Sequence, residues 1–198
     1  MAEGAEAAPS VSYPLTFDVQ YPEELSRWLI FVKWLLVVPH LIVLYGLGVA
    51  ANLITLIAWF VILFTKRYPP ELFSFVVSIN RWGANVTAYT FLLTDDYPPF
   101  SWEANEYPVT YDVEYPEELS RWLIFVKLIL AIPHLIVLAL LFIGALIALT
   151  VAWFAILFTK RFPESLFDFL VGVLRWQYRV SAYTNLLRDE YPPFSLEP

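Results

Sequence analysis

The chain has 198 residues, of which 59% are hydrophobic, 18% aromatic and only 16% charged, and its formal net charge is −7. A soluble domain contains about 45–50% apolar residues, so this composition excludes a soluble enzyme and a disordered chain and indicates a membrane protein. The acidic balance argues against nucleic acid as a partner, and the absence of cysteine excludes disulfides and thiolate chemistry.

The chain begins with a small, acidic segment and then consists of one unit written twice. Residues 13–101 and 107–195 align without a gap at an offset of 94 positions, with about 55 of the 89 positions identical. Polar and proline positions match as well as apolar ones, which indicates a tandem duplication rather than chance. We therefore expect a disordered tail (1–12) without the features of a signal peptide, a first repeat, a linker (102–106) and a second repeat (107–198).

Each repeat opens with a segment in which apolar residues alternate with polar ones. Leu15, Phe17 and Val19 share one face of this segment, and residues 107–114 repeat the pattern. The alternation predicts a short edge strand, with an extended loop as the alternative. Pro22 and the two glutamates after it then mark the start of a helix.

A long uncharged run follows in each repeat, over residues 34–65 and 128–159. As one helix, such a run would measure about 48 Å, whereas the hydrocarbon core of a bilayer is about 30 Å thick. Two spans fit each run if the chain turns back near residues 45–52, where two glycines break the helix, and near residues 139–144. The sequence thus predicts a transmembrane hairpin in each repeat.

The placement of the cations supports these hairpins. All 12 Lys and Arg residues lie outside the two apolar runs. With one hairpin per repeat they all fall on the same side of the membrane, which is the positive-inside pattern and places both termini in the cytoplasm. One span per repeat is the alternative, but near-identical flanks would then insert in opposite orientations.

Another helix is predicted after each apolar run, over residues 72–93 in the first repeat. Apolar and aromatic residues are interrupted there by polar ones, and the second copy contains Asp168, Arg175 and Arg179. The pattern predicts an amphipathic helix in the plane of the membrane interface, and the arginines disfavour a third spanning helix. Each repeat ends in the motif DxYPPFS, an aromatic loop suited to the headgroup region.

The candidate polar groups at membrane depth are Lys33, His40, Lys127 and His134. His40 lies seven residues after Lys33, so the two share one helix face, and a proton or anion path along that face is one hypothesis. The alternative is a neutral imidazole that satisfies carbonyl groups freed by the preceding proline. Two histidines without nearby carboxylates do not predict a metal site.

Arginine–tryptophan pairs recur in both repeats. Arginine suits lipid phosphate and tryptophan suits the glycerol level, so these residues are candidates for headgroup binding or anchoring. Internal ion pairs with acidic residues are the alternative. The candidate residues, with one further arginine, are Arg27, Trp28, Arg81, Trp82, Arg121, Trp122, Arg175, Trp176 and Arg179.

Motifs of known enzyme and metal sites are missing from the sequence. The acidic residues, among them Asp95, lack EF-hand spacing, and no phosphate-binding glycine loop, nucleophile elbow or HExxH motif occurs. The acids are therefore interpreted as a solvated cap, and neither an enzyme nor a cofactor is predicted.

The repeated motifs RWLIFVK, PHLIVL, LFTKR and DxYPPFS together resemble the prokaryotic DUF4389 family. These are small membrane proteins of bacteria and archaea without an assigned activity, so the resemblance implies a prokaryotic integral membrane protein and carries over no catalytic residue. The copies differ within the predicted amphipathic helix, and any ligand of that helix would be bound differently by each. The first copy has Asn80, Gly83, Ala84 and Asn85 where the second has Leu174, Gln177, Tyr178 and Arg179.

We therefore expect an all-α integral membrane protein of two tandem repeats, each a transmembrane hairpin plus an amphipathic interfacial helix, with short strand segments on the cytoplasmic side. The expected location is the prokaryotic inner membrane, as a multi-pass protein. The expected function is a non-enzymatic scaffold or accessory subunit of a membrane complex or homo-oligomer, whose partners are the bilayer and other membrane chains. The alternative is a lipid-handling or small-solute or proton transport protein that uses the Lys33–His40 and Lys127–His134 faces.

Overall fold

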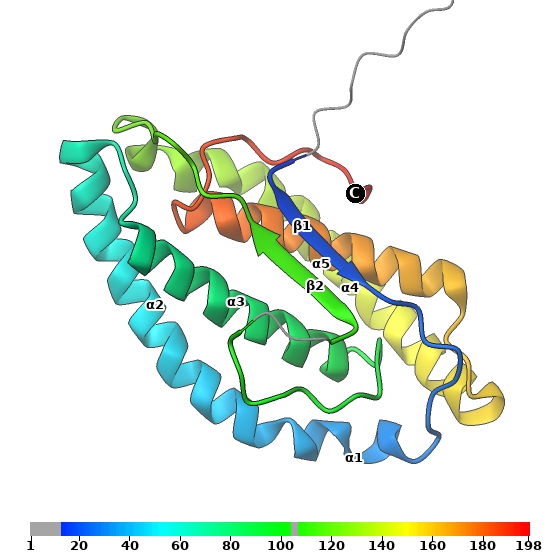
Figure 1. The fold of residues 1–198 in the computed structure, drawn as a ribbon. Helices are drawn as coiled ribbons and strands as arrows, with labels where there is room; N and C mark the ends of the chain where they lie inside the picture. Colours follow the sequence, from blue (N-terminus) through cyan, green and yellow to red (C-terminus); the bar gives the residue numbers. More distant parts are fainter. Residues whose placement is uncertain (1–12, 104–106) are drawn as a thin grey trace, which may run out of the picture.

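A computed structural model describes residues 13–103 and 107–198 and shows a mostly helical protein (Figure 1). The predicted tail, residues 1–12, and residues 104–106 of the predicted linker lie outside the described residues. In chain order the elements are β1 (Leu15–Val19), α1 (Leu29–Leu36), α2 (Val38–Thr65), α3 (Pro70–Thr90), β2 (Val109–Val113), the 3-10 helix η1 (Leu123–Phe125), α4 (Lys127–Thr159) and α5 (Glu164–Thr184).

Each apolar run forms one long helix, so the two predicted hairpin turns are wrong. Helix α2 continues through residues 45–52, and α4 continues through residues 139–144. A helix bonds its backbone groups internally, whereas a turn among apolar side chains leaves them without partners. The helical cost of Gly46 and Gly48, about 1 kcal/mol each relative to alanine, is smaller than that loss.

The prolines of the PHLIVL motif bend the long helices without ending them. Only Val37 separates α1 from α2, and the pair forms a helical stretch of 37 residues, Leu29–Thr65. Pro39 stands in the first turn of α2, where a missing N–H is tolerated. Its counterpart Pro133 lies inside α4, which continues past it.

The two strands confirm the predicted alternation. Strand β1 pairs antiparallel with β2, with Leu15 opposite Val113 and Val19 opposite Val109. In each strand the odd-numbered residues are buried and the even-numbered ones are exposed. Strand β1 packs on α5, and β2 packs on α3. The strand of each repeat therefore packs on the last helix of the other repeat (Figure 1).

Backbone hydrogen bonds repeat this exchange at the ends of the long helices. The N–H of Leu25 donates to the carbonyl of Lys160 at 2.8 Å, and the N–H of Leu119 donates to the carbonyl of Lys66 at 2.7 Å. The start of α1 thus lies beside the end of α4, and the segment before η1 lies beside the end of α2. The long helices run antiparallel and the two repeats are related by an approximate twofold axis (Figure 1).

Helices α3 and α5 are central helices rather than the predicted interfacial ones. Helix α3 contacts both α2 and β2, and α5 contacts both α4 and β1. Beyond Ser74, α3 exposes only Thr90, and beyond Asp168 no residue of α5 is exposed. The apolar sides of these helices are covered by the chain itself, so they are not available to lipid.

Candidate functional site

Each repeat buries a lysine of its apolar helix beneath the loop that carries the DxYPPFS motif. Lys33 Nζ lies 2.7 Å from Asp95 Oδ1 and donates to the carbonyl of Thr94 at 2.6 Å. It also lies 4.7 Å from the ring centroid of Tyr89 on α3. The backbone N–H of Ser26 donates to Asp95 as well. One carboxylate therefore joins the loop, α1 and the segment before α1.

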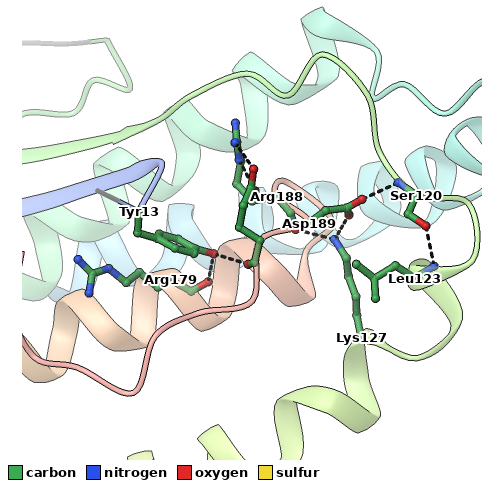
Figure 2. A network of polar contacts seen from close by, with 8 residues as sticks. Tyr13, Ser120, Leu123, Lys127, Arg179, Arg188 and Asp189 are labelled. Atoms are coloured by element: carbon green, nitrogen blue, oxygen red, sulfur yellow. Dashed lines mark hydrogen bonds and ion pairs between the residues drawn. The ribbon is translucent and has the colours of Figure 1, made fainter. Parts of the chain in front are cut away.

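The second repeat contains the same arrangement. Lys127 Nζ lies 2.8 Å from Asp189 Oδ1, donates to the carbonyl of Arg188 at 2.6 Å, and lies 4.9 Å from the ring centroid of Tyr183. Figure 2 shows Lys127 pointing toward Asp189, with the N–H of Ser120 on the other side of the carboxylate. Asp95 and Asp189 are thus ion-pair partners of buried lysines. The interpretation of Asp95 as part of a solvated acidic cap is therefore wrong.

A buried histidine lies about two helical turns after the lysine in each long helix. His40 is fully buried, and its Nδ1 accepts a hydrogen bond from Trp82 Nε1 at 3.1 Å. The Phe100 ring stacks on the imidazole with 3.9 Å between centroids, and Tyr97 OH donates to the carbonyl of Leu36 at 3.1 Å. The imidazole itself bonds no backbone carbonyl within the described residues, contrary to the alternative considered from the sequence.

The histidine arrangement also recurs in the second repeat. His134 Nδ1 accepts from Trp176 Nε1 at 3.0 Å, Phe194 stacks on the ring at 4.0 Å, and Tyr191 OH donates to the carbonyl of Leu130 at 3.0 Å. Since Nδ1 is the acceptor, the neutral ring carries its proton on Nε2. The Nε2 atoms of both histidines are buried and have no partner within the described part of the chain.

We call each lysine–histidine arrangement a clasp. The structure brings together Lys33 and His40, which the sequence placed on one face, and adds residues that the sequence analysis did not assign to a site. A matched aspartate next to the motif YPPFS in both copies was the signal that could have identified the lysine partner. The first clasp consists of Lys33, His40, Trp82, Asp95, Tyr97 and Phe100, and the second of Lys127, His134, Trp176, Asp189, Tyr191 and Phe194.

The predicted arginine–tryptophan pairs fall into two classes. Trp28 and Trp122, at the starts of the long helical segments, are 79% and 74% exposed. Arg27 Nη2 donates to the carbonyl of Phe158 at 3.1 Å, and Arg121 lies at the equivalent position of the second repeat. These two pairs lie where a headgroup region could contact them.

The other two pairs lie inside the protein, contrary to the prediction of a headgroup site. Trp82 and Trp176 are buried in the clasps. Arg81 Nε donates to the carbonyl of Tyr111 at 3.0 Å, and its Nη2 lies 3.0 Å from Asp112 Oδ1. Arg81 thus holds β2 on α3 through the backbone and a side chain of the strand.

Arg175 repeats this role in the other half of the molecule. Its Nε donates to the carbonyl of Phe17 at 2.8 Å, and its Nη2 lies 3.1 Å from Asp18 Oδ1. Arg179, one turn later, is also buried and lies against Tyr13. Both arginines therefore face β1 and its surroundings.

The largest exposed feature is the apolar surface of α1, α2 and α4. In the apolar stretches of the two long helices only 11% and 22% of residues are buried, and both helices are long and apolar enough to cross a membrane. Exposed apolar patches on soluble monomers rarely exceed a few hundred Å². Representative residues, all at least half exposed, are Trp34, Ile42, Tyr45, Leu53, Phe64, Leu128, Ile136, Leu140, Ile147 and Phe158.

Comparisons with known proteins give one match. A family model described as "Domain of unknown function (DUF4389)" matches residues 27–101 and again residues 121–195. The two matches confirm the resemblance seen in the sequence and the tandem duplication. No curated protein and no solved structure matches the chain. Within residues 13–103 and 107–198, no group of three or more His, Asp or Glu side chains could hold a metal ion.

Proposed function

The chain belongs to the DUF4389 family, and on that premise we propose that it is a non-enzymatic membrane protein that serves as a scaffold or accessory subunit. The observation that carries this proposal is the uncovered apolar surface along α1, α2 and α4. Burying one large apolar side chain is worth about 1.5–3 kcal/mol. A surface of this extent therefore has to be covered by lipid or by other membrane chains.

We further place both long helices along one leaflet of the bilayer rather than across it. Helix α4 has 33 residues, which is about 50 Å of helix, and a tilt of up to about 40° does not fit that length into a core of about 30 Å. Cations stand at both ends of the antiparallel pair, with Lys66 and Arg67 at one end and Lys160 and Arg161 at the other. A one-leaflet placement keeps all of them on one side.

In this placement α3, α5 and the sheet face water. They cover the sides of α2 and α4 that carry the clasps, while the exposed sides of the long helices face lipid. Trp28 and Trp122 then lie at headgroup level, which is where tryptophan is enriched. We assign the water-facing side to the cytoplasm because lysine and arginine favour that side.

Thiol labelling distinguishes this placement from spanning helices. The chain has no cysteine, so single variants R67C and R161C in sealed vesicles each present one thiol to a membrane-impermeant maleimide. Because α2 and α4 run antiparallel, spanning helices would expose the two thiols on opposite sides. We expect both to react from the same side, and labelling from opposite sides would overturn the one-leaflet placement.

A matched pair of variants controls the labelling experiment. Ile42 and Ile136 occupy equivalent positions on the two long helices and are 69% and 60% exposed in the protein alone. I42C and I136C should stay unlabelled in vesicles and react once detergent is added. Labelling of either thiol in intact vesicles, or release of the chain by an alkaline wash, would contradict membrane insertion.

The scaffold role is tested by what accompanies the protein. Native mass spectrometry in mild detergent should find further copies or other chains bound to it. A lone monomer without any partner would remove the scaffold proposal and leave the membrane placement intact.

Transport or lipid handling is the second candidate, and one observation favours it. The unpartnered Nε2 atoms of His40 and His134 lie buried on the same faces as Lys33 and Lys127. Proton flux or lipid scrambling by the protein in liposomes should then be lost in a H40A/H134A double variant. A robust activity that this variant retains would exclude the histidine path.

A further inference from the structure

A pocket lies beside each strand, at β1 where it packs on α5 and at β2 where it packs on α3. The pocket at β1 has a volume of about 230 Å³ and is lined by Tyr13, Phe17, Arg175 and Arg179, among others. Its lining residues come mainly from β1 and from α5, the helix on which β1 packs.

The first repeat has the equivalent pocket without the second arginine. That pocket, at β2, has a volume of about 300 Å³ and is lined by Tyr107, Tyr111, Arg81 and Asn85, among others. Each of these residues is offset by 94 positions from its counterpart in the other pocket: Arg81 and Asn85 precede theirs, and Tyr107 and Tyr111 follow theirs. At one lining position the two pockets therefore differ in charge, since the neutral amide of Asn85 stands where the second repeat has the guanidinium of Arg179.

Arg179 is buried without a carboxylate. It is 2% exposed, and within the described residues its side chain forms no ion pair or hydrogen bond. Its guanidinium carbon lies 5.6 Å from the ring centroid of Tyr13. In Figure 2 the guanidinium extends away from the hydrogen bonds of Tyr13 and Arg188. An unpaired buried charge is strongly destabilising, so a partner is expected.

The neighbouring groups do not supply that partner. Arg175 donates to the carbonyl groups of Phe17 and Leu196, both at 2.8 Å, and pairs with Asp18 at 3.1 Å. Asp18 thus pairs with Arg175, whereas Arg179 has no ion pair within the described residues, although Pro198 at the end of the chain also lines the pocket. Burial and the proximity of Arg175 lower the pKa of Arg179, and an anion in the pocket would offset both effects.

We propose that this pocket binds a small oxyanion, a carboxylate or phosphate group of a soluble compound, which accepts hydrogen bonds from the guanidinium of Arg179. The planar fork of arginine matches two oxygens of such a group. Asn85 gives the first repeat no charge at this position, so the protein has one anion site in two otherwise similar pockets.

The test is a titration of the full-length protein in detergent with inorganic phosphate and with acetate. Chloride keeps the ionic strength constant. We expect a saturable rise in the unfolding temperature with at least one of the two oxyanions, and line broadening of the phosphate ³¹P signal that acetate reverses. The absence of a saturable response to both oxyanions would overturn the proposal.

Two variants locate the response. R179N gives the second pocket the residue of the first, and we expect it to weaken binding by about tenfold or more because the charge-assisted hydrogen bonds are lost. N85A is the matched control in the other pocket and should bind like the wild type. Unchanged binding by R179N, or equal loss in N85A, would contradict the assignment. If R179N does not fold, R179Q keeps more of the side-chain length and gives the same comparison.

Discussion

The two clasps are alike, whereas the two strand-side pockets are not. The lysine–aspartate distances are 2.7 Å and 2.8 Å, and the tryptophan–histidine distances are 3.1 Å and 3.0 Å. The pockets contain Asn85 in one repeat and Arg179 in the other. Both pairs of regions arose from the same duplicated unit.

This difference distinguishes features that stabilise each repeat from a feature that could bind a ligand in one repeat only. Each clasp ties the YPPFS loop to its own long helix, so we expect both repeats to depend on one for stability. A pocket need be functional in only one of them, and the second copy is then free to differ. We therefore interpret the clasps as structural and look for ligand chemistry at Arg179.

The largest expected effect comes from removing the carboxylate of a clasp. Asp95→Ala leaves Lys33, which is 2% exposed, without a counter-charge, and breaking a buried ion pair costs about 3–5 kcal/mol. Asp189→Ala should cost the same because Lys127 is equally buried. Denaturant unfolding in mild detergent measures both.

A surface pair serves as the control for these two variants. Glu118 lies 3.9 Å from Lys66, and its side chain is 67% exposed, so Glu118→Ala should change the free energy of unfolding by less than about 1 kcal/mol. If one clasp variant matches this control while the other is strongly destabilised, the clasps are not equivalent and the comparison fails.

The tryptophan of each clasp should have the next largest effect. Trp82→Phe leaves His40 Nδ1 buried without a donor, which costs about 1–3 kcal/mol. Trp176→Phe should cost the same at His134. The exposed Trp28 provides the control, because Trp28→Phe should stay within about 0.5 kcal/mol in detergent. Thermal unfolding of the three variants would show the order, and equal losses would contradict the buried hydrogen bond.

Sequence reasoning predicted the duplication, the strands and the second helix of each repeat. Alternation at Leu15, Phe17 and Val19 is a local signal that burial on one strand face explains. The hairpins were predicted wrongly because each apolar run was taken to cross the bilayer, for which it is too long as one span, and because Gly46 and Gly48 were taken to break the helix. In an apolar environment an unbroken hydrogen-bond ladder is worth more than the glycine penalty.

The exchange of strands could not be predicted at all. Arg81 has two equivalent carboxylates to choose from, Asp18 of its own repeat and Asp112 of the other, and the sequence around both is nearly the same. The structure pairs Arg81 with Asp112. Contacts within and between identical repeats look the same in sequence, so only the path of the chain in space decides between them. The buried state of Trp82, which was predicted to be a surface anchor, also follows from this packing.

Two glycines of the central helices sharpen the comparison further. A Cβ at Gly172 in α5 would lie 2.8 Å from Leu196 Cβ and 3.0 Å from its carbonyl oxygen. Gly172→Ala should therefore destabilise the protein by about 1 kcal/mol, the lower end for overpacking, since only one neighbour has to move. Gly83→Ala in α3 meets nothing within 4 Å and should stabilise it by about 0.5–1 kcal/mol. Unfolding temperatures that shift in the same direction would contradict these contacts.

The smallest expected effect is a pH dependence at an ion pair of the second repeat that has no equivalent in the first. Arg188 donates to both carboxylate oxygens of Glu190, at 2.6 Å and 2.9 Å, whereas Thr94 and Asp96 occupy the equivalent positions of the first repeat. Burial raises the pKa of Glu190, but the hydrogen bonds from Arg188 outweigh burial and hold that pKa below its usual value.

The sign of this effect follows from the lowered pKa. The stabilisation by Glu190 is fully present above the pKa of the unfolded chain, about 4.3, and is lost as the pH falls through the lower pKa of the folded protein. Because the Glu190 side chain is 49% exposed, we expect less than about 1 kcal/mol. The difference in free energy of unfolding between wild type and Glu190→Gln should therefore shrink from pH 7 to pH 3 and also in high salt. If this difference in free energy stays constant with pH, the Arg188–Glu190 pair contributes no charge-dependent stability. Arg179 would then be the charged residue that distinguishes the second repeat from the first in ligand binding.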